Sequence, residues 1–226
     1  MQHALVQKPY KGMGMEGPVA KWYTSLTGKA ADDFKALAQR VAGEVPPGSS
    51  VLEVAPGPGY FVIELAKLGA YRISAIDISH TFVKIAREKA RQAGVGIDFR
   101  QGDVAHMPFA DESFDFLLCR AAFKNFSQPV QALEEMYRVL KPGGRALIID
   151  LRKDAPPESV SAAVDGMHLG RVNRFITKLT FRRMLLQRAY TRGEFEQFLS
   201  QTRFGPIDIQ QSLTGLELTL QRHGAA

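Results

Sequence analysis

The sequence contains a single cysteine, Cys119, among its 226 residues. One cysteine excludes an intramolecular disulfide and a cysteine-based metal cluster, so we expect no metal site. No apolar run reaches the roughly 18 residues that a membrane span needs, and no basic stretch followed by an apolar one of signal-peptide length opens the sequence. These absences predict a cytoplasmic protein without a transmembrane segment.

Acidic residues are missing from one long segment of the chain. From His168 to Arg192 there are seven Arg or Lys residues and no Asp or Glu, while the net charge of the chain is +6. A helical spacing in this segment predicts an amphipathic insertion with an apolar stripe (Val172, Phe175, Ile176 and Leu179) and a basic face (Arg171, Arg174 and Lys178). Such a face suits peripheral contact with anionic lipid, but also a solvated surface with no partner.

The overall composition is that of one globular domain. Hydrophobic residues make up 45% of the chain and charged residues 23%, which suits a single domain over residues 1–226. We expect an N-terminal arm with helices (1–48), a core (49–151), a cap insertion (152–192) opened by a polar, Pro-rich linker, and a terminal helix with a hairpin (193–226). The linker is Lys153–Ser161.

Segments with strand and helix periodicity alternate through the core. Strands are predicted at Val51–Val54, Arg72–Ile76, Ile97–Arg100, Phe114–Cys119 and Ala146–Asp150. Helices are predicted at Val19–Leu26, at Phe34–Val41, after Val54, from the capping residue Ser79 to about Arg91, from Pro129 to about Leu140, and at Glu194–Leu199. This alternation predicts an α/β fold, a doubly wound sheet of parallel strands. Ile207–Leu213 and Leu216–Gln221 predict a terminal antiparallel hairpin.

The stretch Val51–Phe61, VLEVAPGPGYF, predicts a buried strand that runs into a glycine-rich turn and then a helix. Gly57 and Gly59 have no side chains, so a ligand can approach the main chain closely, and the following helix directs backbone N–H groups toward it. The prolines between them, Pro56 and Pro58, restrict the loop. Two glycines alone are equally compatible with an ordinary tight turn.

Three acids lie at or near the ends of the first three predicted strands: Glu53, Asp77 and Asp103. Ligands of open α/β sheets bind beyond the carboxyl ends of the strands. An acid inside an apolar strand, as Glu53 is, needs a partner such as a ligand ammonium group. Asp77 can accept hydrogen bonds from both hydroxyls of a ribose, and Asp103 from an adenine amino group. This combination predicts a site for an adenosine joined to an amino acid.

The residues from Ser49 to Gly144 resemble class I S-adenosylmethionine-dependent methyltransferases, in particular the group similar to the ubiquinone and menaquinone C-methyltransferases. The first motif of that family, an acid followed by three glycines at alternate positions, matches Glu53, Ala55, Gly57 and Gly59, with alanine in place of the first glycine. The ribose acid falls on Asp77. The adenine segment matches Gly102, Asp103 and Val104, followed by Pro108 and Phe109, and the stretch Ser113–Gly144 matches the fourth strand and its helix.

The resemblance implies a seven-stranded Rossmann-like sheet with a terminal antiparallel strand and a helical cap at about Pro156–Arg192. It implies S-adenosyl-L-methionine as cofactor and S-adenosyl-L-homocysteine as product. The cofactor would contact the first motif with Pro56, the pair Asp77 and Ile78, and the segment Gly102–Val104. Arg120, just past the fourth strand, is a candidate contact for the cofactor carboxylate or an acidic substrate, and is equally compatible with a structural ion pair. Relatives often carry histidine where this chain has Lys124 and Asn125, so a histidine-dependent role there is not expected.

The acceptor and the catalytic groups are less well defined by the sequence. The sulfonium already carries an activated methyl group, so the protein has mainly to align an acceptor and exclude water. Candidate bases are Lys124, His168 and Asp150, with His106 as a further one, and each is also compatible with a structural role. Candidate substrate contacts are Tyr10, Tyr23, Phe123 and Lys124. Cys119 ends an apolar strand and is expected in the core.

We expect a methyltransferase that acts on a small, partly hydrophobic acceptor by direct in-line transfer. An RNA or protein methyltransferase is an alternative, but nucleic acid is disfavoured because Arg120–Phe123 replaces the Asn/Asp-Pro-Pro-aromatic motif of enzymes that methylate base amino groups. A nicotinamide-dependent oxidoreductase is a second alternative, disfavoured by the glycine spacing. A third is a regulator that binds the cofactor without catalysis.

Overall fold

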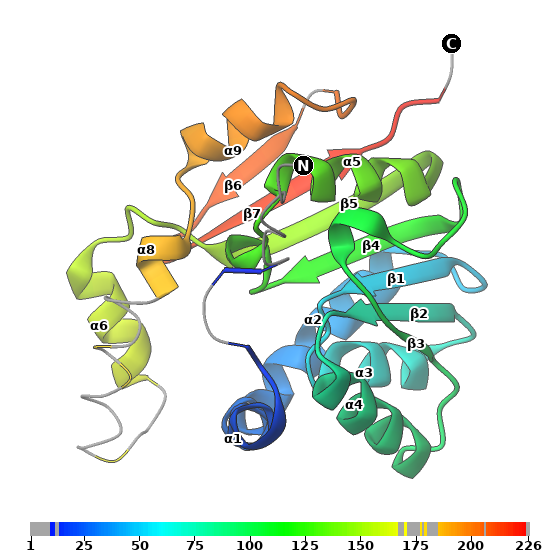
Figure 1. Cartoon of the computed structure of the whole chain (residues 1–226), viewed down its shortest axis with the longest axis horizontal. Coiled ribbons are helices and arrows are strands. Elements are labelled where there is room, and N and C mark those ends of the chain that lie inside the picture. The colour runs from blue at the N-terminus through cyan, green and yellow to red at the C-terminus, as the bar shows by residue number, and fades with distance from the viewer. Residues whose placement is uncertain are drawn as a thin grey trace, which may run out of the picture.

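The computed structural model describes residues 10–11, 14–166, 170, 177, 179, 185–205 and 207–224. Its centre is a seven-stranded sheet in the order β3-β2-β1-β4-β5-β7-β6 (Figure 1). The strands are β1 (Ser50–Val54), β2 (Arg72–Asp77), β3 (Asp98–Gln101), β4 (Phe114–Arg120), β5 (Leu140–Leu151), β6 (Asp208–Gln211) and β7 (Gly215–Gln221).

Strands β1 to β5 pair in parallel, and β7 is antiparallel to both β5 and β6. The predicted doubly wound seven-stranded sheet and its terminal antiparallel hairpin are therefore confirmed. Because β1 lies between β2 and β4, the chain reverses its direction of progress across the sheet next to β1. This is the position where ligands bind in open α/β sheets.

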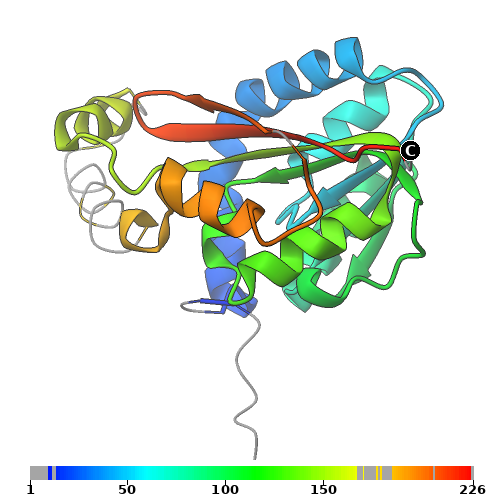
Figure 2. The same ribbon diagram turned by 90° about the horizontal axis from the view of Figure 1, so that it is seen from above.

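Helices cover both faces of the sheet (Figure 2). One hydrophobic core joins the sheet to α2 (Ala31–Glu44), α3 (Tyr60–Leu68) and α4 (His80–Gln92), and a second joins it to α5 (Pro129–Val139) and α9 (Arg192–Leu199). The remaining elements are α1 (Gly17–Thr27), α6 (Pro157–Asp165), α8 (Leu186–Arg188) and the single 3₁₀ turns η1 (Gly28–Ala30), η2 (Val104–His106) and η3 (Phe123–Asn125). No described helix is long and apolar enough to cross a membrane.

Some expected boundaries were wrong. Helix α6 begins at Pro157, inside the segment predicted as a linker, because proline is favoured in a first helical turn and Glu158 complements the helix dipole there. Strand β5 begins at Leu140, six residues before the predicted start, since Leu140 already pairs with Phe114. Most of the predicted amphipathic stripe lies outside the described residues.

Two large apolar side chains lie at the surface. Leu68 of α3 is 44% exposed, and Trp22 of α1 is 63% exposed. Leu68 is the last residue of α3, where the helix leaves the sheet. Tyr23, the neighbour of Trp22 on α1, packs against α4: the centre of its ring lies 5.7 Å from that of Phe82.

The turn between β1 and α3 is built from residues in the left-handed backbone region. Ala55, Gly57 and Gly59 have φ angles of 54°, 55° and 77°. A Cβ at Gly59 would lie 3.0 Å from the Cβ of Ala86, whereas a Cβ at Gly57 would meet nothing within 4 Å. Gly59 thus permits close packing of the turn on α4 and β3, while Gly57 leaves open space above the turn.

This difference predicts unequal costs for two matched substitutions. Gly57→Ala adds only left-handed strain, about 1–2 kcal/mol, and Gly59→Ala adds overpacking of about 1 kcal/mol or more to the same strain. Urea unfolding of both variants and the wild type measures the two losses. Equal losses would show that the Gly59 environment relaxes freely and would contradict the packing explanation.

Candidate functional site

Acidic and basic side chains meet at the carboxyl edge of the sheet. Glu53 lies in β1, Asp77 and Arg120 end β2 and β4, and Asp150 lies next to the last residue of β5. Glu53, Asp77 and Asp150 are only 4%, 5% and 5% exposed. Buried carboxylates are costly without partners, so the surroundings of each one indicate its role.

Glu53 has an unsatisfied oxygen. Its Oε2 atom is buried and has no hydrogen-bond partner in the described part of the chain, while the carboxylate accepts a hydrogen bond from the Val62 N–H. Burial raises the pKa of Glu53 to about 8, and the positive charge of Arg120 only partly opposes this. A cationic group placed here would satisfy the free oxygen and restore the ionised form.

Asp77 ties the glycine-rich turn to the start of α4. Its Oδ2 accepts a hydrogen bond from the Gly57 N–H at 3.0 Å, and its Oδ1 accepts one from the Ser79 N–H at 2.8 Å. Burial raises the pKa of Asp77 to about 6, and these two hydrogen bonds oppose the rise. Each carboxylate oxygen keeps further acceptor capacity, which suits two ligand hydroxyls.

Ala55 stands where the family motif has its first glycine, and it adopts the left-handed backbone that a glycine would favour. Its N–H donates to the Ile76 carbonyl at 2.7 Å, which joins the turn to β2. Pro56, the next residue, is half-buried, and its carbonyl accepts a hydrogen bond from the Gly59 N–H at 3.1 Å. A non-glycine residue held in this region is strained and is often found at ligand sites.

The predicted adenine segment lies beside β2. The Gly102 N–H donates to the Asp77 carbonyl at 3.0 Å, and Asp103 caps η2 by accepting a hydrogen bond from the Ala105 N–H at 3.0 Å. Val104 is 8% exposed and Ile78 is half-buried. The segment Gly102–Val104 is therefore positioned next to Asp77.

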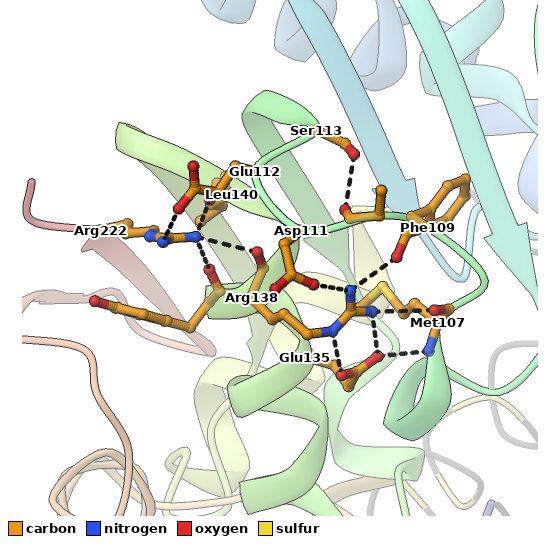
Figure 3. Close-up of polar contacts among 11 residues, drawn as sticks. Met107, Phe109, Asp111, Glu112, Ser113, Glu135, Arg138, Leu140 and Arg222 are labelled. Atoms are coloured by element: carbon orange, nitrogen blue, oxygen red, sulfur yellow. Dashed lines mark hydrogen bonds and ion pairs between the residues drawn. The ribbon is translucent and has the colours of Figure 1, made fainter.

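The loop that follows is held by α5. Arg138 donates to the carbonyls of Phe109 and Met107 at 2.8 and 3.1 Å and to Asp111 at 2.7 Å, and Glu135 accepts from the Met107 N–H at 2.7 Å (Figure 3). Glu135 also pairs with Arg138 at 2.7 Å. These contacts fix the chain from Met107 to Asp111.

Two of the candidate bases pair with each other. Lys124 Nζ donates to Asp150 Oδ1 at 2.7 Å, the Lys124 N–H donates to Asp150 Oδ2 at 2.9 Å, and Nζ also donates to the Ala121 carbonyl. The two side chains are 4% and 1% exposed. This ion pair joins the turn after β4 to the end of β5, and both side chains are engaged in it. His106 has a 71% exposed side chain, and His168 lies outside the described residues.

Phe123 and Cys119 belong to the core. Phe123 is fully buried and its ring lies 5.0, 5.3 and 6.0 Å from those of Phe195, Phe126 and Tyr190. Cys119 is fully buried, and burial raises the pKa of its thiol well above the ordinary value. The core position expected for Cys119 is confirmed. Lys124, next to Phe123, is held in the ion pair described above.

The N-terminal arm and α1 lie beside the carboxyl ends of the strands (Figure 1). Tyr10 bridges to Phe126, the Lys11 N–H donates to the Asn125 carbonyl at 2.6 Å, and the Lys11 ammonium contacts the Tyr190 hydroxyl. Asn125 and Phe126 follow β4. The arm therefore begins at the β4 side of the edge.

The arm ends on the β2 side. Glu16 accepts hydrogen bonds from the His80 and Thr81 N–H groups at 2.9 and 3.0 Å and from the Thr81 hydroxyl. Ser79 Oγ donates to the Met15 carbonyl at 2.6 Å. Residues 10–11 therefore lie at the β4 side of the edge, and residues 15–16 lie at its α4 side. Glu16 was missed by sequence reasoning because it is one acid in an apparently loose arm, 64 residues from His80.

Tyr23 faces the same edge from α1. Burial raises the pKa of its hydroxyl; the charge of Arg120 opposes the rise, and those of Asp150 and Asp77 add to it. These three groups act on Tyr23 only because they share its surroundings. Arg120 itself lies over the Phe34 ring at 4.4 Å and makes no ion pair among the described residues. The structure thus brings Glu53, Asp77, Arg120 and Tyr23 together.

The sequence matches known proteins in the same region. Residues 52–148 match the family model described as "Methyltransferase domain". The chain is similar to the demethylmenaquinone methyltransferase of Deinococcus radiodurans, with 39% identity over 110 residues that cover 48% of this chain and 44% of that protein. It is also similar to the ubiquinone/menaquinone biosynthesis C-methyltransferase of Haemophilus ducreyi, with 34% identity, covering 47% and 42% of the two chains. The match thus spans less than half of each relative.

Solved structures extend the likeness of fold to nearly the whole chain. A putative S-adenosyl-L-methionine-dependent methyltransferase from Methanococcus maripaludis superposes with a TM-score of 0.77 and 21% identity, covering 95% of this chain and 97% of that one. The [4+2]-cyclase SpnF superposes with a TM-score of 0.57 and 21% identity over 84% and 81% of the chains. The fold is therefore shared by proteins that differ in reaction.

The buried acids that follow the strands occupy the positions that the family resemblance assigns to the cofactor, and the unsatisfied oxygen of Glu53 and the open space at Gly57 fit that cofactor. Residues 52–148 match the methyltransferase domain model, and the fold of the chain is similar to that of a putative S-adenosyl-L-methionine-dependent methyltransferase.

Proposed function

We propose that the protein transfers the methyl group of S-adenosylmethionine to a small, partly hydrophobic acceptor. The main support for this proposal is the buried Glu53 carboxyl, which has an unsatisfied oxygen and lies in the strand before the glycine-rich turn, where Gly57 leaves open space. The acceptor is quinone-like in this proposal, in line with the names of the relatives from Deinococcus radiodurans and Haemophilus ducreyi.

Each group at the edge has a role in holding the cofactor. Glu53 binds the ammonium group of its amino acid part, and Arg120 binds the carboxylate, because opposite charges stabilise each other strongly where water is excluded. Asp77 accepts hydrogen bonds from the ribose hydroxyls. Asp103 accepts a hydrogen bond from the adenine amino group, and Val104 makes an apolar contact with the adenine ring.

The bound cofactor supplies an activated methyl group that transfers to a nucleophile without prior activation. The protein has to align the acceptor and exclude water. The arm and α1, held at Phe126 and at Thr81, cover the edge and can exclude water from it. A general base is required only if the acceptor arrives protonated.

The acceptor meets the cofactor on the side of the edge near β4 in this proposal. Tyr10 and Tyr23 are the candidate contacts there that are not fully buried, since both are half-buried on the arm and α1. Phe123 and Lys124 pack inside the protein in this conformation and would support the acceptor site from below. Aromatic surroundings of this kind suit a flat apolar acceptor.

Cofactor binding tests the proposal directly. Calorimetric titration should show micromolar binding of S-adenosylmethionine and S-adenosylhomocysteine, weakened by about 1–3 kcal/mol in Asp77→Ala because a buried charged acceptor is lost. Asp208→Ala, which removes an exposed acid on β6, is the control and should bind as the wild type does. Binding of NAD or NADP in place of these ligands would overturn the proposal in favour of an oxidoreductase.

The raised pKa of Glu53 predicts that cofactor binding releases a proton. At pH 7, below its pKa of about 8, the carboxyl is mostly protonated in the ligand-free protein, and a bound ammonium lowers that pKa. We expect a release approaching about one proton at pH 7, measured by titrating S-adenosylhomocysteine in two buffers of different ionisation enthalpy. Glu53→Gln should bind with almost no proton release; unchanged release in this variant would contradict the role of Glu53.

The same shift makes the ligand-free protein pH-dependent. The folded-state pKa of Glu53 lies above the ordinary value of 4.5, so its contribution to stability is fully present below about pH 4.5 and is lost as the pH rises through 8. Glu53→Gln should flatten this part of the stability profile. Thermal unfolding of both proteins between pH 5 and 9 provides an independent control for the calorimetry.

The arm contacts predict that Glu16 slows cofactor exchange. Glu16→Gln removes the negative charge from the N-terminus of α4, an interaction of about 0.3–1 kcal/mol. Stopped-flow binding should then show association and dissociation faster by about two- to fivefold. Glu88→Gln removes another exposed acid of the same helix and should leave both rates unchanged. Equal rates in the wild type and Glu16→Gln would show that the arm does not gate the edge.

A further inference from the structure

We propose a second ligand site at the opposite, amino edge of the sheet, which binds an organic phosphate through Arg72 and Ser74. A cavity of about 350 Å³ lies there between the first residues of the strands and the loop 108–113. Arg72 begins β2 and Ser50 begins β1, whereas the cofactor residues lie at the other ends of these strands. The proposal does not depend on the methyltransferase activity.

The polar character of this cavity follows from strand register. Ser50 lies opposite Arg72 in the β1–β2 pair, and Arg100 lies opposite Ile76 in the β2–β3 pair. Side chains of a strand alternate between faces, so Arg72, Ser74 and Ile76 share one face. On that face the residues toward the carboxyl edge are apolar and pack in the core with α5, while those toward the amino edge are polar and line the cavity.

Arg72 has donors to spare. Its described hydrogen bond runs from Nε to Ser50 Oγ at 3.2 Å, and no described carboxylate forms an ion pair with it. The two nearby acids are engaged elsewhere: Asp115 pairs with Lys141 at 2.8 Å, and Asp98 with Arg100 at 2.8 Å. Arg72 is exposed and its charge helps to lower the pKa of Asp115, but the two form no ion pair, so the terminal guanidinium nitrogens of Arg72 remain available to a ligand. An oxyanion can accept two parallel hydrogen bonds from them.

Ser74 adds a hydroxyl next to this charge. It is half-buried in the cavity wall, and its side chain makes no hydrogen bond within the described residues. A half-buried hydroxyl beside an unpaired guanidinium suits a phosphate oxygen, which accepts from both. Ser113, the other hydroxyl on the far wall, is already used in a hydrogen bond to the Ala110 carbonyl at 2.7 Å.

The remaining wall is flat and apolar. The guanidinium of Arg100 lies over the Phe109 ring at 4.6 Å, and the Phe109 ring lies 5.1 Å from that of Phe114. Pro108 and Ala110 flank this ring in the cavity lining. A ligand that joins an oxyanion to a flat apolar body would place the body here, which is why we infer an organic phosphate and not the bare ion.

The wall is held in place without a ligand. Arg138 of α5 binds the Phe109 carbonyl and Asp111, as Figure 3 shows, so the loop needs little ordering on binding. From Ser50 to Val54 the strand rises about 13 Å, so the cavity and the cofactor edge are separate. Both ligands can be bound at the same time.

Titration with phenyl phosphate and with inorganic phosphate, followed by calorimetry and by backbone amide shifts, tests the proposal. We expect phenyl phosphate to bind at millimolar concentration or below, to shift the amides of residues 72–74 and 108–110, and to bind more tightly than inorganic phosphate. Arg72→Gln should weaken phenyl phosphate at least tenfold, and Ser74→Ala severalfold. Arg91→Gln makes the same change of charge on α4, where Arg91 pairs with Glu88, and should have no effect.

Three outcomes would overturn the site: no binding of phenyl phosphate to the wild type, equal weakening in Arg72→Gln and Arg91→Gln, or equal affinity for the two phosphates. Binding of S-adenosylhomocysteine to each variant checks folding. That ligand binds at the far edge, so its affinity should not change in Arg72→Gln. If Arg72→Gln is unstable, the affinity of Ser74→Ala for phenyl phosphate decides whether the site exists. This substitution removes only one oxygen atom and should leave the fold intact.

Discussion

The structure buries several carboxyl groups at one edge of its parallel sheet, and it must supply a partner for each of them. Glu53, Asp77 and Asp150 lie in or at the end of buried strands, where an unpaired carboxylate is costly. Two of them are compensated inside the protein: Asp77 by backbone N–H groups and Asp150 by Lys124. Glu53 keeps one oxygen without a partner among the described residues, and this difference is why we propose that a ligand cation binds there.

The buried pair Lys124–Asp150 changes how the candidate bases are understood. Two hydrogen bonds from Lys124 to Asp150 connect the end of β5 with the turn after β4, and a third, to the Ala121 carbonyl, lies within that turn beside Arg120. Ala121, in that turn, has a φ of 57° and donates its N–H to the Ile149 carbonyl. A buried ion pair adds little net stability, but removal of one partner is strongly destabilising. The pair therefore positions Arg120 and its loop, a role that needs no proton transfer.

The described residues of the arm contact both sides of the carboxyl edge. Lys11 lies at the β4 side and Glu16 at the α4 side. The cavity at the amino edge is held by α5. The two edges of the sheet thus differ: buried acids and the arm lie at one, and a cavity of about 350 Å³ lies at the other. Proteins of this fold differ in reaction, as the cyclase SpnF illustrates, so such local features decide function.

The sequence alone determined that acids lie at or near the ends of the first strands, and it determined the glycine-rich turn, the capping by Ser79 and the terminal hairpin. Each of these is a local pattern of burial, turn residues or helix caps. It also indicated that Glu53 needs a partner. Only the tertiary structure decided that Lys124 meets Asp150, that Glu16 caps α4 and that Trp22 faces solvent. Those contacts join residues that are 26 to 65 positions apart, or depend on where a helix lies, and no local periodicity encodes them. The lack of an ion pair to Arg72 among the described residues is of the same kind, since Asp98 and Asp115 pair with Arg100 and Lys141 in the packed protein.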